Sequence, residues 1–111
     1  MQIVFATHDI RAEANSFQMM TIKYGEQKAW KIRQRLDEIA AAPNLDDLAR
    51  LPATKCKCMD EEKSLICVVT LHPFVLVFDM ARNFDSRVKA INALWKKVDL
   101  VEIMNLDKEA K

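Results

Sequence analysis

The amino-terminal half of the chain carries apolar residues at the spacing of amphipathic helices. A short apolar segment, 1–6, fits a strand and is followed by Thr7 and Asp9, either of which can cap a helix. Apolar positions then recur over 10–21, and again over 25–42 in the stripe Ala29, Ile32, Leu36 and Ile39. This spacing places side chains on one helix face, so we expect two helices that meet near Gly25, the only glycine in the chain.

The polar positions of the second helix are expected to face solvent. They are Lys28, Lys31, Arg35 and Glu38. Pro43 cannot continue that helix, and Asn44 stands where an N-cap belongs, with Asp47 three residues later. We therefore expect one or two further helical turns over 44–51.

The pattern changes beyond Pro52. Three β-branched or apolar runs follow, separated by the charged Asp-Glu-Glu-Lys at 60–63 and by His72-Pro73; they are TKCKCM, SLICVVTL and FVLVF. These features predict a meander of three antiparallel strands. Runs that are apolar on both faces favour central strands, covered on at least one side by the helices.

The last quarter of the chain is less regular. Residues 81–90 are expected to form a loop, and 87–97 fit a helix or a strand. We expect VDLVEIMNL to be a final strand and the tail DKEAK to fray. The whole order predicts one α+β domain over 1–111, with two N-terminal helices on one face of a mostly antiparallel, four- to five-stranded sheet.

Composition narrows the class of protein further. The 111 residues are 50% hydrophobic and 30% charged, which is typical of a globular chain. No apolar run approaches the roughly 18 residues of a membrane helix, so we expect a cytoplasmic protein with no membrane partner. The net charge is only +1, so nucleic-acid binding would need a local basic patch.

Three stretches of the sequence resemble the RelE/ParE superfamily, and most of all its HigB-type branch, the plasmid maintenance killer toxins. They are FATHDI at 5–10, the run from YGEQKAW to PATKC at 24–56, and HPFVLVF at 72–78. Members of that branch open with a short strand and carry an arginine-rich second helix ending in a Leu-x-x-Leu-Pro segment. They also place a His-Pro turn before the fourth strand.

The resemblance implies a toxin of a type II toxin–antitoxin system. Such toxins enter the ribosomal decoding site and cut mRNA there, whereas the ParE branch poisons DNA gyrase. The partners implied are a cognate antitoxin, HigA-like with a helix-turn-helix, and the ribosome with its mRNA; no cofactor is implied. The fold implied, two helices on a four- or five-stranded antiparallel sheet, agrees with the one expected from the hydrophobic pattern.

The positions that match the family's catalytic residues are mostly altered. Cleavage of RNA without a metal requires Arg, Lys, His or Tyr side chains to move protons and to stabilise the phosphorane. In the resembled branch they lie in a basic turn, on the strand after His-Pro and at the chain's end. Here the turn has Glu62 at its arginine position, the strand has Val75, and the end reads Lys108-Glu109-Ala110. Lys63 alone keeps its charge and is the catalytic candidate.

Other candidates have an ordinary structural explanation as well. Lys55, Lys57, Lys31 and Arg35 are candidates for RNA binding, but a solvated helix face also explains the last two, because Asp37 and Glu38 lie alongside. His72 is either a proton-transfer group or part of a structural turn.

The three cysteines do not have the spacing of a common zinc site. Cys56 and Cys58 are two residues apart, and a hairpin would bring Cys67 roughly opposite Cys56, with His72 as a conceivable fourth ligand. Zinc sites commonly use C-x₂-C, so we expect reduced thiols and no metal.

Three functions remain open at this point. The first is a ribosome-dependent mRNA endonuclease. The second is a gyrase-poisoning type of protein, which needs no catalytic side chains. The third is an inactive toxin that retains antitoxin binding and persists on a mobile element. Because the expected Arg and His are missing, the sequence leaves open whether the protein is an enzyme.

Overall fold

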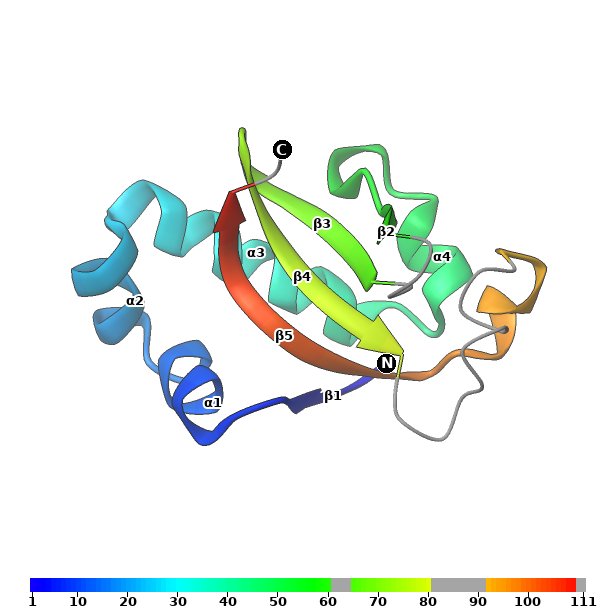
Figure 1. Ribbon diagram of the computed structural model, residues 1–111, viewed down its shortest axis with the longest axis horizontal. Helices are drawn as coiled ribbons and strands as arrows, with labels where there is room; N and C mark the ends of the chain where they lie inside the picture. The colour runs from blue at the N-terminus through cyan, green and yellow to red at the C-terminus, as the bar shows by residue number, and fades with distance from the viewer. Residues whose placement is uncertain (61–64, 81–91, 110–111) are drawn as a thin grey trace.

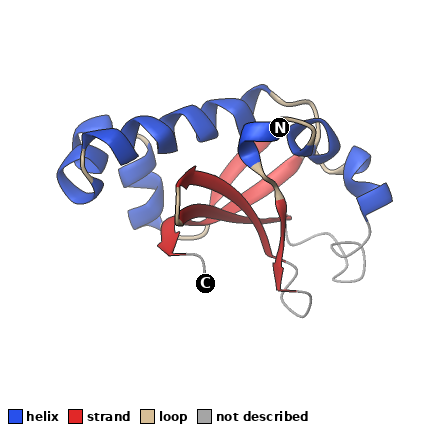
Figure 2. Cartoon of the chain, turned by 90° about the horizontal axis from the view of Figure 1, so that it is seen from above, coloured by secondary structure: helices blue, strands red, loops and turns tan. Residues whose placement is uncertain are grey.

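The computed structural model describes residues 1–60, 65–80 and 92–109, which form a layer of helices against one sheet (Figure 1). The elements are β1 (Gln2–Phe5), α1 (His8–Ala14), α2 (Phe17–Tyr24), α3 (Glu26–Ala41), α4 (Leu45–Ala49), β2 (Lys57–Asp60), β3 (Leu65–Leu71), β4 (Phe74–Met80) and β5 (Leu100–Glu109), with 3₁₀ turns at Pro52–Thr54 and Asn92–Lys97. Figure 2 shows the helices on one side of the strands. The predicted α+β class is confirmed.

The strands form one sheet in the order β1-β5-β4-β3-β2. Consecutive strands from β2 to β5 pair antiparallel, as the expected meander requires. β1 pairs parallel with β5, so the sheet is mixed. The hydrophobic pattern could not predict this pairing, because β1 and β5 lie at opposite ends of the sequence and a long connection allows either direction.

The first expected helix is divided into two. α1 ends at Ala14, with Asn15 as its C-cap, and the Ser16 side chain then accepts a hydrogen bond from the Met19 amide at 3.2 Å, which starts α2. Gly25 joins α2 to α3 with φ +88° and ψ +156°, a conformation that essentially only glycine adopts. The predicted cap of α4 is confirmed, since the Asn44 side chain accepts from the Asp47 amide at 2.9 Å.

The core lies between α3 and the sheet. The expected α3 stripe is buried and packs with apolar residues of the strands, among them Val68, Leu76, Phe78, Val101 and Ile103. Two of the side chains expected to face solvent point inward instead. Arg35 is only 5% exposed, and the Lys28 side chain is 18% exposed. Each has found a polar partner on the sheet, which offsets the cost of burying its charge.

β5 extends further along the sequence than the final strand that was expected. Residues 107–109 belong to β5 because they pair with the start of β4, so the frayed-tail prediction is wrong for these three residues. The ambiguous segment contains a 3₁₀ helix at Asn92–Lys97, while the loop predicted at 81–90 lies outside the described residues. Among the helices that the structure describes, none is both long and apolar enough to span a membrane.

Candidate functional site

The sheet brings together two of the three regions that the toxin resemblance links to RNA cleavage. The strand after His72-Pro73 pairs with the end of β5, so that Val75 lies opposite Lys108 and Phe74 opposite Glu109. Directly opposed residues of an antiparallel pair share a sheet face. Val75 is 4% exposed, whereas Lys108 is exposed. The exposed cation at this place is therefore on the neighbouring strand rather than at the position where the family has arginine.

His72 lies at the turn between β3 and β4, where the His72-Pro73 peptide bond is cis and the His72 side chain is exposed. The third region, the turn with Glu62 and the catalytic candidate Lys63, lies outside the described residues. The structure therefore places His72 at the same end of β4 as Val75. The assignment of Lys63 rests on the sequence resemblance alone.

The four candidates for RNA binding have different environments. Lys55 is exposed, in the left-handed conformation with φ +46°, and Lys31 is half-buried on α3. Lys57 belongs to β2, but its side chain is outside the described part of the structure. An RNA contact remains a prediction for these three lysines.

Arg35 has a structural environment that the sequence did not predict. Its Nε donates a hydrogen bond to the Val69 carbonyl oxygen at 2.6 Å, and its Nη1 lies 2.5 Å from Glu38 Oε1. These contacts connect α3 to β3. The prediction that Arg35 lies on the solvent face is wrong, and its guanidinium group is directed at the sheet rather than at a surface where RNA could bind.

A second, half-buried charge on α3 contacts β5. Lys28 Nζ lies 3.1 Å from Asp107 Oδ2 and 3.2 Å from the centre of the Phe74 ring. The Asp107 side chain is only 10% exposed, and its Oδ1 has no hydrogen-bond partner. The ion pair and the cation–π contact together hold the end of β5 against α3. Sequence reasoning missed this cluster because its two charges are 79 residues apart.

The described residues do not form a cluster of metal-ligating side chains. The register of β2 places Cys67 opposite Lys57 rather than opposite Cys56, which separates it from the position that the sequence suggested. Over 1–60, 65–80 and 92–109, no group of three or more His, Cys, Asp or Glu residues gathers at one point. The absence of a metal site is still a prediction for the whole chain.

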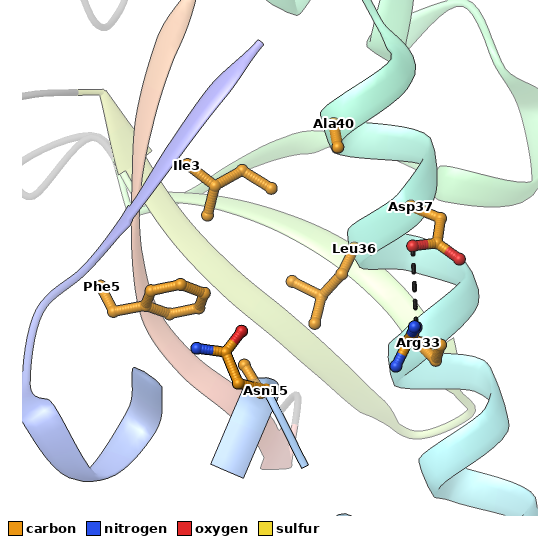
Figure 3. Close-up of a pocket in the computed structure, with 8 residues that line it drawn as sticks. Ile3, Phe5, Asn15, Arg33, Leu36, Asp37 and Ala40 are labelled. Carbon is orange, nitrogen blue, oxygen red and sulfur yellow. Dashed lines mark ion pairs between the residues drawn. The ribbon is translucent and has the colours of Figure 1, made fainter. Parts of the chain in front are cut away.

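A hollow of about 360 Å³ opens between β1 and α3, where the two layers of the fold part at the edge of the sheet. Figure 3 shows Ile3 and Phe5 directed from β1 toward Leu36 of α3. The hollow is lined by Ile3, Phe5, Ala14, Asn15, Arg33, Leu36, Asp37 and Ala40. At its rim Arg33 Nε lies 3.8 Å from Asp37 Oδ1, a long and largely exposed ion pair.

Two further hollows adjoin this one. The first runs along β1, where Val4 and Arg11 join Ile3, Phe5 and Asn15. The second shares Arg33 and Asp37 and extends over α3 to Trp30. Trp30 is 58% exposed and packs against the Phe17 ring at a centroid distance of 4.6 Å. Such an exposed aromatic beside hollows is typical of a surface that binds another protein.

The two methionines of α2 differ in exposure. Met20 is fully buried, but Met19 is 46% exposed and Ile22 is 78% exposed. Apolar side chains are therefore exposed to solvent on α2 as well as at Trp30 of α3.

Comparison with known proteins identifies no relative: no family model, no curated protein and no solved structure matches the chain.

Proposed function

We propose that the chain is a toxin of a type II toxin–antitoxin system, related to the HigB-type branch of the RelE/ParE superfamily, and that it acts on mRNA at the ribosome. Two observations support the proposal. The sequence resemblance lies in the stretches 5–10, 24–56 and 72–78. The chain also has the coarse order that the resemblance implies, a strand, helices and then a meander of strands, but its sheet is mixed rather than antiparallel because β1 pairs parallel with β5.

The single observation that carries the RNA-directed part is the pairing of Val75 with Lys108. It places an exposed ammonium group beside the strand position where the family has its arginine. A positive charge at that point can stabilise the phosphorane that forms when RNA is cut. We assign this role to Lys108, with Lys63 as the second catalytic candidate and Lys55, Lys57 and Lys31 as contacts to the RNA backbone.

A second candidate function is that of an inactive family member that binds an antitoxin or another protein, as a decoy or a gyrase inhibitor. Two specific observations favour it. The position that matches the family's catalytic arginine is a buried valine, and a row of hollows extends from β1 over α3 to the exposed Trp30. Binding of this kind needs no catalytic side chain.

A reconstituted translation reaction tests the two functions against each other. The purified protein is added to ribosomes stalled on a defined mRNA, and the 5′ ends of the products are mapped. The proposal predicts cleavage at the decoding site, and Lys108→Ala should lower the rate by about tenfold to a hundredfold because one charge that stabilises the transition state is lost.

The matched control is Lys96→Ala, which removes an exposed lysine from the 3₁₀ helix at Asn92–Lys97 and should leave the rate unchanged. Intact mRNA with the wild-type protein would contradict the nuclease and leave the binding function.

A further inference from the structure

β1 is an edge strand whose outer side has no partner strand in the described part of the sheet. The Gln2 amide donates to the carbonyl oxygen of Asp99, just before β5, at 2.8 Å, and the amide of Ala6, just after β1, donates to the Ile103 carbonyl oxygen of β5 at 2.9 Å. Because the backbone groups of a strand alternate in direction, those of Ile3 and Phe5 point the other way, toward the open edge. An extended peptide can pair with such an edge through main-chain hydrogen bonds.

The hollows beside this edge can accept apolar side chains of a bound peptide. Ile3 and Phe5 line both the hollow between β1 and α3 and the one along β1 (Figure 3). Leu36 and Ala40 of α3 complete the apolar part of the lining, and Asn15 adds a polar side chain to both hollows. A strand added at β1 places alternate side chains on the helix-facing side of the sheet, and these would enter the hollow.

The charges at the rim favour an acidic partner. Three charged residues line the two hollows, namely Arg11, Arg33 and Asp37. Arg11 is exposed and has no carboxylate partner among the described residues, and Arg33 is held only by its 3.8 Å pair with Asp37. Two arginines against one aspartate attract carboxylates at the ends of a bound segment.

We propose that the open edge of β1 and the hollow beside it bind an extended, acidic segment of a partner protein as an added strand, with alternate apolar side chains seated between β1 and α3. A second copy of this chain fits the edge less well. Two β1 strands side by side would bring two sets of these arginines to one interface, and like charges there oppose association. The proposal does not depend on nuclease activity.

The test uses the full chain labelled with ¹⁵N and a synthetic peptide, acetyl-Glu-Val-Thr-Leu-Thr-Val-Glu-amide. Amide shifts should map to β1 and to the facing turns of α3, with saturation at millimolar peptide. Two further peptides carry N-methyl groups at alternate amides in opposite phases. Because only one phase points its amides at β1, one methylated peptide should lose binding at least tenfold and the other should keep it.

A variant of the protein tests the hollow itself. Ala40→Glu places a longer, charged side chain in the hollow from an exposed helix position, and should weaken the peptide at least tenfold. Gln27→Glu makes the same change of charge on an exposed position of α3 away from the three hollows, and should bind as the wild type does. If Ala40→Glu does not fold, the two methylated peptides still decide the matter with wild-type protein.

Three results would overturn the proposal. They are the absence of shifts at the Ile3 and Phe5 amides, equal binding of both methylated peptides, and a concentration-dependent dimer that Ala40→Glu abolishes. The last of these would assign the edge to a second copy of the chain.

Discussion

Lys28 and Arg35 show how single charged residues hold the two layers together. Both lie on α3, and both point toward the sheet: Lys28 to Asp107 on β5, and Arg35 to the Val69 carbonyl on β3. A buried ion pair contributes little relative to an apolar pair, but removing one partner leaves a charge without compensation. The two contacts therefore fix how α3 lies across the sheet more than they add to the free energy of unfolding.

Replacing Lys28 should be costly for this reason. In Lys28→Met the Asp107 carboxylate, whose side chain is 10% exposed, loses the one side-chain partner that it has among the described residues. We expect the free energy of unfolding in urea to fall by about 2–3 kcal/mol, less than for a fully buried pair because some solvent reaches both groups.

Arg50→Met is the control for this change, because it removes an ion pair whose arginine is 69% exposed, and should cost under about 1 kcal/mol. A loss no larger in Lys28→Met than in Arg50→Met would contradict the structural role of Lys28.

Tyr24, the only tyrosine in the chain, should report on alkaline unfolding. Burial, followed by its hydrogen bond to Glu13, raises the pKa of Tyr24 above its ordinary 10.0. The unfolded chain therefore loses the phenolic proton first as pH rises. The stabilisation is complete below pH 10 and is lost as pH rises through the higher folded pKa.

Phenolate absorbance measures this directly. The folded protein should titrate at higher pH than the urea-unfolded chain, and Tyr24→Phe should flatten the decline of stability with pH up to the point where other groups titrate. The pKa of Lys23 is also raised by its hydrogen bond to Glu13, so Lys23 contributes a decline of the same sign that remains in Tyr24→Phe. Identical phenolate titrations in the folded and unfolded states would contradict the Tyr24–Glu13 contact.

The elements differ in how far their own sequence determines them. α3 and α4 follow from local signals, the apolar stripe and the Asn44 cap, and both were predicted. The division between α1 and α2 depends on Ser16, which was overlooked because the apolar pattern continues across it. The parallel pairing of β1 with β5 depends on a contact between distant segments, for which a single sequence carries no local signal.

The candidate site could be predicted from the sequence only in part, as the fold could. The motif resemblance pointed to the strand after His72-Pro73 and to the end of the chain, and the sheet places these segments side by side. The inward direction of Lys28 and Arg35 was not predictable, because a polar position between apolar ones usually faces solvent. The hollow beside β1 forms because the helix layer and the sheet separate at the β1 edge, and no sequence pattern predicts this separation.

The junction between α2 and α3 at Gly25 should be sensitive to substitution. A Cβ at this position would meet no atom within 4 Å, so the cost of Gly25→Ala comes from the backbone at φ +88°. We expect a loss of about 1–3 kcal/mol in the free energy of unfolding. Gln27→Ala, two residues later on an exposed position of α3, should change it by less than about 0.5 kcal/mol, and equal losses in the two variants would contradict the assigned backbone strain.

The molecule as a whole has two separate regions to which functions can be assigned. One lies where the start of β4 meets the end of β5, with Lys108 beside Val75, and the other lies along β1 and over α3 to Trp30. The first supports the nuclease proposal, and the second supports a protein partner such as an antitoxin. The proposed toxin would use both regions, the first toward RNA and the second toward the antitoxin that neutralises it.

Tightly repressed expression in a bacterial host, with growth followed and transcript ends mapped by sequencing, tests the toxin proposal most directly. We predict growth arrest after induction, new 5′ ends inside coding regions, and relief of both by Lys108→Ala but not by Lys96→Ala. Normal growth with intact transcripts at confirmed protein levels would contradict the nuclease. Arrest accompanied by double-strand DNA breaks and intact mRNA would instead assign the chain to the gyrase-poisoning kind.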